Sequence, residues 1–187
     1  MQPTDVAADL AGVLHTEEQI HARIAEMCRE IEADERAATD GRPLLLVGVL
    51  KGAVMVMADL ARELTIPVEM DWMAVSSYGS STRSSGVVRI LKDLDSALEG
   101  RRVLIVEDII DSGLTLSWLV ANLRSRGPAS VEVCALLRKP EAQRIAVDVK
   151  YSGFDIPNEF VVGYGLDYAE QYRNLRAIAV LAPHVYE

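Results

Sequence analysis

The sequence predicts an α/β domain with a mainly parallel sheet flanked by helices. Apolar runs such as LLLVGVL at 44–50 and VLIV at 103–106 are typical of strands buried on both faces, as in parallel sheets. Segments with helical spacing alternate with these runs, and this alternation implies right-handed β–α–β crossovers. The 187 residues fit one domain, because they contain no repeat and no linker that would divide the chain.

The elements can be assigned in order along the chain. Thr16 and Gln19 have the spacing of a capping box, which predicts that a helix begins there and runs over 17–38. Its apolar face at helical spacing comprises Ile20, Ile24, Met27 and Ile31. The remaining expected elements are strand 44–50, helix 53–64, strand 68–76, a returning strand 87–91, strand 103–107, helix 115–126, strand 130–138 and shorter strands at 147–151, 160–162 and 177–181.

The composition restricts the class of function. The formal charge of −9, from 28 acidic and 19 basic residues, argues against broad electrostatic binding to nucleic acid or to an anionic membrane. The first 14 residues contain two aspartates and no basic residue, unlike a secretory signal, and the apolar region 43–58 is too short to span a membrane. Cys28 and Cys134 are expected to be buried free thiols, so we expect a cytoplasmic protein.

The segment 103–116, VLIVEDIIDSGLTL, carries the clearest chemistry. Glu107 and Asp108 follow a buried strand, and the small polar turn that begins at Asp111 opens into an apolar helix. In open α/β sheets, ligands bind at the carboxyl ends of the strands, and a glycine-containing turn at a helix N-terminus offers amides to a phosphate. Carboxylates suit sugar hydroxyls and Mg²⁺. The segment therefore predicts a site for a phosphorylated sugar.

The motif EDIIDSGLT resembles the phosphoribosyl pyrophosphate (PRPP) signature of the type I phosphoribosyltransferases, in the form found in their hypoxanthine-guanine branch. The resemblance covers about residues 44–182 and implies that family's fold, with a small hood built from about residues 140–170 and part of the N-terminus. It implies purine salvage, in which 5-phosphoribosyl passes from PRPP to N9 of hypoxanthine or guanine to give IMP or GMP and pyrophosphate. A homodimer or homotetramer is also implied.

The resemblance assigns roles to the residues of this motif. Glu107 and Asp108 address the ribose hydroxyls and, with Asp167, the Mg²⁺ cofactor. Asp111 matches the proposed general base or acid at purine N7, whereas the residues alone also allow a helix N-cap. The 5′-phosphate would be held by Ser112, Gly113, Thr115 and the backbone at Leu114. Some members of the family have lysine in place of Leu114, so no side-chain contact is carried over there.

Other blocks match the family in the same order along the chain. Leu50, Lys51 and Gly52 resemble the pyrophosphate-binding loop, whose Leu–Lys peptide is often cis in the family, and Arg173 matches a further pyrophosphate contact that suits a planar guanidinium. Ser77 and Tyr78 begin a Ser-rich run over 77–86 that matches a closing loop, which would shield the reaction from water.

The purine site is implied by the blocks at 136–140 and 160–175. Lys139 matches the lysine that donates to purine O6, Phe160 the residue that stacks on the base, and Val161 the backbone that pairs with the base edge. Asp167 completes this group near the second Mg²⁺. Taken singly, Lys51 and Lys139 also fit solvated strand-end lysines, Phe160 a core residue and Arg173 a surface residue. His15 and His21 match no family position and are expected at the surface.

There are three alternatives to this interpretation, and two of them belong to a different class of protein. A PRPP- or nucleotide-sensing regulator of the same fold would need a basic face or an added DNA-binding domain, and the acidic chain shows neither. A dinucleotide-binding oxidoreductase would need G-x-G-x-x-G after a strand, which is absent from the sequence. A phosphoribosyltransferase for another base stays open, although Lys139 with Phe160 and Val161 favours 6-oxopurines.

Overall fold

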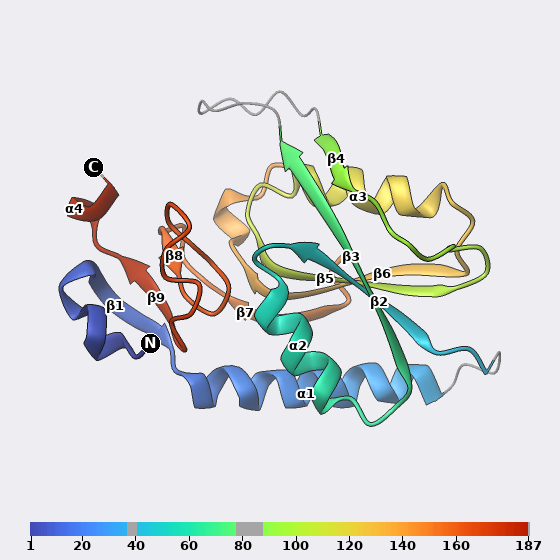
Figure 1. The fold of residues 1–187 in the computed structure, drawn as a ribbon, viewed down its shortest axis with the longest axis horizontal. Helices are drawn as coiled ribbons and strands as arrows, with labels where there is room; N and C mark the ends of the chain where they lie inside the picture. Colours follow the sequence, from blue (N-terminus) through green and yellow to red (C-terminus); the bar gives the residue numbers. More distant parts are fainter. Residues whose placement is uncertain (37–40, 78–87, 187) are drawn as a thin grey trace.

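The computed structural model describes residues 1–36, 41–77 and 88–186 (Figure 1). Its elements are β1 (Leu10–His15), α1 (Glu17–Arg36), β2 (Leu44–Leu50), α2 (Val54–Glu63), β3 (Val68–Ser77), β4 (Val88–Lys92), β5 (Arg102–Ile110), α3 (Leu114–Arg124), β6 (Ser130–Arg138), β7 (Tyr151–Asp155), β8 (Val161–Val162), β9 (Ile178–Leu181) and α4 (Pro183–Tyr186), with 3₁₀ turns at Pro3–Asp9 and Pro140–Ala142.

The main sheet has six strands in the order β4-β3-β2-β5-β6-β7. All neighbouring pairs are parallel except β3 with β4, which confirms the mainly parallel sheet and the returning strand. Helices α1 and α2 cover one face and α3 covers the other (Figure 1). Alternate residues of β2 enter the two cores: Leu44 and Leu46 pack with α1 and α2, and Leu45 and Val47 pack with α3.

The local sequence signals for α1 and for several later elements are confirmed. The Thr16 amide donates to Gln19 Oε1 at 2.9 Å, and the Gln19 amide donates to Thr16 Oγ1 at 3.4 Å, so the capping box forms. Strands β2 and β6 have the predicted bounds, and α2 and α3 begin within one residue of prediction. The predicted end of the first helix, at 37–38, lies outside the described residues.

Strand β7 was predicted at 147–151 and lies at 151–155 instead. Its register with β6, from Cys134↔Tyr151 to Arg138↔Asp155, determines which residues join the sheet. Val147 and Val149 pack against the core beneath α3, so their apolar alternation reflects burial without strand pairing.

A second, three-stranded antiparallel sheet lies beside the main sheet in the order β1-β9-β8, and both chain ends lie near it (Figure 1). Strand β1 was not predicted from the sequence; it pairs with β9 more than 160 residues later, from Leu10↔Leu181 to His15↔Ile178. This sheet carries the segment that follows β8 toward the carboxyl ends of the main strands.

The structure corrects the prediction for one of the two histidines and confirms the prediction for both cysteines. His15, which was expected at the surface, is half-buried; its ring stacks on Phe154 with centroids 3.8 Å apart, and burial lowers its pKa. His21 is exposed, as predicted. Cys28 and Cys134 are buried and free. Among the described residues, none of the helices has the length and apolar character that crossing a membrane requires.

Candidate active site

Three segments that are distant in sequence meet at the carboxyl edge of the main sheet. A Cβ at position 52 would lie 1.7 Å from Asp108 Oδ2, so the Asp108 carboxylate packs directly on Gly52. A Cβ at position 165 would lie 2.1 Å from the Gly52 carbonyl oxygen, so the backbone of Gly165 also packs on this loop. Only glycine allows these approaches. The ends of β2 and β5 and the segment after β8 therefore form one site.

The strand that carries the two carboxylates is longer than predicted. We predicted 103–107, but β5 continues to Ile110 because its ladder with β6 runs on to Ile110↔Arg138. Its pairing with β2 ends at Val106↔Gly48, so Glu107 and Asp108 lie beyond the β2 ladder while still held by β6. The sheet thus fixes both carboxylates and leaves them unpaired on the side that faces the loop after β2.

Burial controls the charge of this acidic pair in the ligand-free protein. Glu107 is 9% exposed, and burial raises its pKa well above the usual range, with a further contribution from Asp108. Burial also raises the pKa of Asp108 to about 6, although the Ile109 amide and the charge of Arg173 oppose this shift. A cation or a set of hydroxyl donors at this place would favour the ionised forms of both residues.

The turn after β5 presents the N-terminus of α3. Gly113 is the N-cap at φ +78°, and its Cα lies so close to the Ile145 carbonyl that a Cβ would approach to 2.4 Å. Asp111 is therefore not the helix cap that the residues alone allowed. The Ser112 carbonyl accepts from the amides of Arg144 and Ile145, which ties the turn to the chain after β6. Leu114 and Thr115 are the first residues of α3, where amide groups point out of the helix.

The loop after β2 brings a lysine to the same edge. The Leu50–Lys51 peptide is cis, as in the family that the sequence resembles. Lys51 is exposed, and its Nζ lies 3.0 Å from Glu170 Oε2. The chain then enters α2 directly, with the Val54 amide donating to the Lys51 carbonyl at 3.2 Å.

The segment after β8 supplies Arg173 and Asp167 as an ion pair. Arg173 Nη2 lies 2.8 Å from Asp167 Oδ1, and Nη1 donates to the Gly165 carbonyl at 2.8 Å. Glu170, at φ +64°, accepts from Arg173 at 3.4 Å as well as pairing with Lys51. The sequence did not reveal Glu170 or Gly165 as site residues. They lie within the block 160–175, but their contacts depend on left-handed backbone that the residue types do not indicate.

The side chains predicted to hold the base lie at two places, one at the end of β6 in the main sheet and one beside β8 of the small sheet. Lys139 directly follows β6 and is 8% exposed, so it is not the solvated lysine that the residues alone favoured. Its amide donates to the Ile110 carbonyl at 2.9 Å, which joins it to the end of β5. Phe160 is 40% exposed and is not a core residue; its ring stacks on Tyr186 at 5.3 Å.

The backbone at Val161 is oriented away from its own sheet. The Leu181 amide donates to the Phe160 carbonyl at 2.8 Å, so Val161 and Val180 form a non-hydrogen-bonded pair in the antiparallel ladder. The N–H and C=O of Val161 therefore point away from β9, at the edge strand of the small sheet. This orientation suits hydrogen bonding to the edge of a planar ligand.

Two predictions about the site concern the metal and the closing loop. Glu107, Asp108 and Asp167 do not form a ready-made cage, because no three acidic, histidine or cysteine side chains gather to hold a metal within 1–36, 41–77 and 88–186. Mg²⁺ usually binds through one or two carboxylates together with substrate phosphates, so the donor set still fits this ion. Ser77 is the last residue of β3, whereas Tyr78 and the rest of the predicted closing loop lie outside the described residues.

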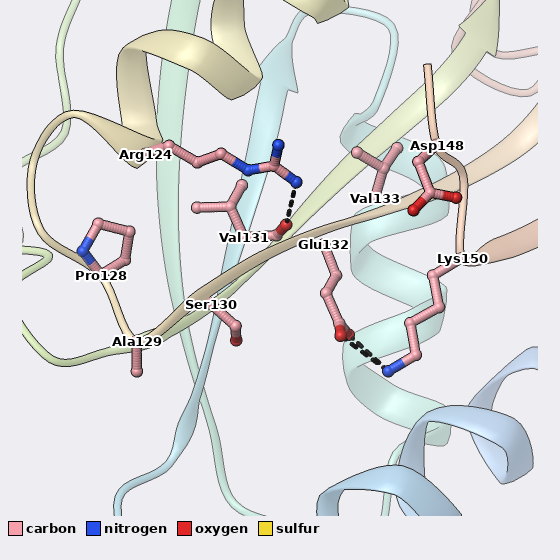
Figure 2. Close-up of a pocket in the computed structure, with 9 residues that line it drawn as sticks. All are labelled: Arg124, Pro128, Ala129, Ser130, Val131, Glu132, Val133, Asp148 and Lys150. Atoms are coloured by element: carbon pink, nitrogen blue, oxygen red, sulfur yellow. Dashed lines mark hydrogen bonds and ion pairs between the residues drawn. The ribbon is translucent and has the colours of Figure 1, made fainter. Parts of the chain in front are cut away.

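The pocket in Figure 2 lies at the opposite end of β6. Its volume is about 450 Å³, and it lies between the end of α3 and the start of β6 and extends to Lys150. The cations in it already have partners: Arg124 donates to the Val131 carbonyl, and Lys150 contacts Glu132 at 2.8 Å (Figure 2). Because ligands of open α/β sheets bind at the carboxyl ends of the strands, the candidate site is the edge described above.

Comparisons with known proteins show the family of the chain. A model of the phosphoribosyl transferase domain matches residues 16–169. The hypoxanthine-guanine phosphoribosyltransferase of Mycobacterium avium is 60% identical over 189 residues, covering 100% of this chain and 93% of the relative. The enzyme of the same name from Bacillus subtilis is 51% identical over 179 residues, covering 96% and 97%. The hypoxanthine phosphoribosyltransferase of Trypanosoma cruzi in complex with the product IMP superposes with a TM-score of 0.88 at 45% identity, covering 95% of this chain and 97% of that one.

Proposed function

The chain belongs to the phosphoribosyl transferase family, and from this membership we infer that it works in purine salvage. It transfers the 5-phosphoribosyl group of PRPP to N9 of hypoxanthine or guanine, which yields IMP or GMP and pyrophosphate. The assignments of individual residues are proposals that rest on the geometry of the site, and the metal, the assembly and the location are further proposals.

The observation that carries these assignments is the close packing of Gly52 on both Asp108 and Gly165. It brings a carboxylate at the end of β5 and the cations Lys51 and Arg173 to one place, as a ribose with a pyrophosphate leaving group requires. We propose that Lys51 and Arg173, with the Leu50–Gly52 backbone, bind the pyrophosphate. Arginine suits this role because its planar fork binds phosphate oxygens through two donors.

The other parts of the two substrates extend from this point along the sheet edge. We propose that Glu107 and Asp108 bind the ribose hydroxyls, and that the α3 N-terminus holds the 5′-phosphate through Ser112, Gly113, Leu114 and Thr115. The purine would lie against Phe160, with its edge paired to the Val161 backbone and its O6 accepting from Lys139. Asp111, between the ribose and base sites, would exchange a proton with N7. Holding both substrates in this order supplies orientation as part of the catalysis.

The experiment that tests the proposed function is an assay of PRPP-dependent nucleotide formation with hypoxanthine, guanine, xanthine and adenine. We expect turnover of the first two bases, and the assay also ranks xanthine. Failure of every base with PRPP would contradict the enzymatic function and favour a PRPP-sensing regulator. We further propose a cytoplasmic homodimer or homotetramer, which sedimentation of the purified protein would distinguish from a monomer.

We propose that the metal is Mg²⁺, which binds together with PRPP. Its ligands from the protein would be Asp108, Glu107 and Asp167. Bound there, the ion would neutralise charge that develops on the leaving pyrophosphate. We expect turnover to be lost in excess chelator and restored by added Mg²⁺. Initial rates of IMP formation during the titration test this expectation, and full activity in excess chelator would contradict it.

Glu170 is expected to weaken PRPP binding, because its carboxylate occupies both proposed pyrophosphate cations in the ligand-free protein. It lies 3.0 Å from Lys51 and 3.4 Å from Arg173, and it must release them when pyrophosphate binds. Exposed ion pairs contribute about 0.2–1 kcal/mol, so Glu170→Gln should tighten PRPP binding by roughly 1.4- to fivefold. Calorimetric titration of PRPP measures this change.

The matched control for this prediction is Glu99→Gln, which removes the same charge from an exposed position outside the site. Similar tightening in both variants would assign the effect to net charge. Weaker binding of PRPP to Glu170→Gln would show that the carboxylate supports the bound state.

A further inference from the structure

A buried tyrosine connects the candidate site to the helix that follows the lysine loop. Tyr164 is 6% exposed and has φ +51°, and its hydroxyl donates to Asp59 Oδ2 on α2. The same Asp59 lies 3.3 Å from His21 Nε2 on α1 and 3.8 Å from Arg62 on α2. The hydrogen bond therefore joins the segment after β8 to the two helices on one face of the main sheet.

The backbone around Tyr164 holds Arg173 in place. The Tyr164 amide donates to the Leu175 carbonyl at 2.8 Å, and the Gly165 amide donates to the Arg173 carbonyl at 2.9 Å. The Gly165 carbonyl in turn accepts from the Arg173 guanidinium at 2.8 Å. Any shift of Tyr164 thus moves both the backbone and the side chain of Arg173.

Asp59, which accepts the hydrogen bond from Tyr164, is also connected to the site. Helix α2 begins at Val54, two residues after Gly52, and Asp59 lies in its second turn. Gly52 is also the residue on which Gly165 packs. Tyr164 and Asp59 therefore clamp together the two segments that carry Lys51 and Arg173, in addition to the contact between Gly52 and Gly165.

We propose that Tyr164 and Asp59 are a positioning pair for PRPP. The pair touches no substrate and acts through Gly165 and Gly52, setting the separation of Lys51 and Arg173. The proposal rests on the proposed pyrophosphate site. It predicts a larger loss at the PRPP side of the reaction than at the purine side, because the Tyr164 hydroxyl bonds to α2, which directly follows the Lys51 loop, although the Tyr164 backbone lies only three residues after Val161.

The test is Tyr164→Phe, which removes the hydroxyl and keeps the ring. Because small displacements of binding groups have large kinetic effects, we expect the KM for PRPP to rise roughly tenfold, with less than about a twofold change in the KM for hypoxanthine. The variant Asp59→Asn keeps an oxygen that accepts from the hydroxyl and should have a KM for PRPP near that of the original protein. Asp59→Ala should behave like Tyr164→Phe.

Tyr151→Phe is the matched control. Tyr151 is also buried and donates to an aspartate, Asp34, at 2.8 Å, but it joins β7 to α1 away from the candidate site. Both Phe variants should lower the melting temperature, and only Tyr164→Phe should change the KM for PRPP. An equal change in both, an unchanged KM in Tyr164→Phe, or an equal rise for both substrates would overturn the positioning role. If Tyr164→Phe does not fold, the contrast between Asp59→Ala and Asp59→Asn decides in the same way.

Lys51→Ala separates this proposal from the function on which it rests. Weaker binding of pyrophosphate to Lys51→Ala, measured by calorimetry, together with an unchanged KM in Tyr164→Phe, would reject the positioning pair alone. Unchanged pyrophosphate binding by Lys51→Ala would reject the proposed pyrophosphate site, and with it the reason for a clamp at this place.

Discussion

Asp111→Asn is expected to lower kcat for IMP formation by roughly 10²–10⁴-fold, the range typical of a lost general acid or base. The amide has the shape of the carboxylate but does not take up a proton from N7. Asp111 is exposed in the turn between β5 and α3, and the helix cap is Gly113, so the substitution leaves the cap in place. Rates at saturating hypoxanthine and PRPP measure the effect.

Binding of PRPP distinguishes this catalytic role from a structural one. The affinity for PRPP should change little in Asp111→Asn, or improve, because a negative charge leaves the neighbourhood of the phosphate. Asp148→Asn, the same substitution at an exposed position near the opposite end of the sheet, should leave kcat unchanged. Near-normal turnover by Asp111→Asn would remove the proton relay from the mechanism.

The parts of the fold that could be predicted are those determined by local pattern. The run LLLVGVL is apolar at every position because β2 is buried on both faces between β3 and β5. The capping box at Thr16 likewise depends on residues three apart. Strand β1 could not be found in this way. Every residue of Leu10–His15 is exposed or half-buried, and the segment becomes a strand through pairing with β9, which is distant in sequence.

The same distinction between local pattern and distant contacts applies to the residues of the candidate site. Glu107, Asp108 and the turn at 111–115 could be located from sequence because one strand and the helix after it carry all of them. The close approach of Gly52 to Asp108 and Gly165 could not, since it depends on how three separate loops pack. The partners of Lys51 and Tyr164 were missed for the same reason: Glu170 and Asp59 are 119 and 105 residues away from them.

Lys139→Gln is expected to change the choice of base. The Lys139 ammonium can donate to O6 of hypoxanthine or guanine, whereas adenine presents an amino donor at that place. Two donors facing each other in a desolvated pocket cost on the order of 1–3 kcal/mol, or about 5- to 150-fold in kcat/KM. The original protein should therefore use hypoxanthine and guanine and largely reject adenine. Glutamine carries no charge, and its amide can accept from the adenine amino group as well as donate. The variant should therefore lose activity with 6-oxopurines, and the difference in kcat/KM between these bases and adenine should become smaller.

The burial of Lys139 supports this prediction, because only 8% of the residue is exposed, so a bound base would exclude water from its ammonium group. Its backbone bond to Ile110 is unaffected by the substitution, so the loop should keep its place at the end of β5. The KM for PRPP should stay constant, and Lys150→Gln, which removes a lysine charge at the far end of β6, should leave the order of bases unchanged. Values of kcat/KM for the three bases decide the matter. Efficient use of adenine by the original protein, or an unchanged preference in Lys139→Gln, would place base recognition elsewhere on the sheet edge, with the Val161 backbone as the remaining source of donors and acceptors.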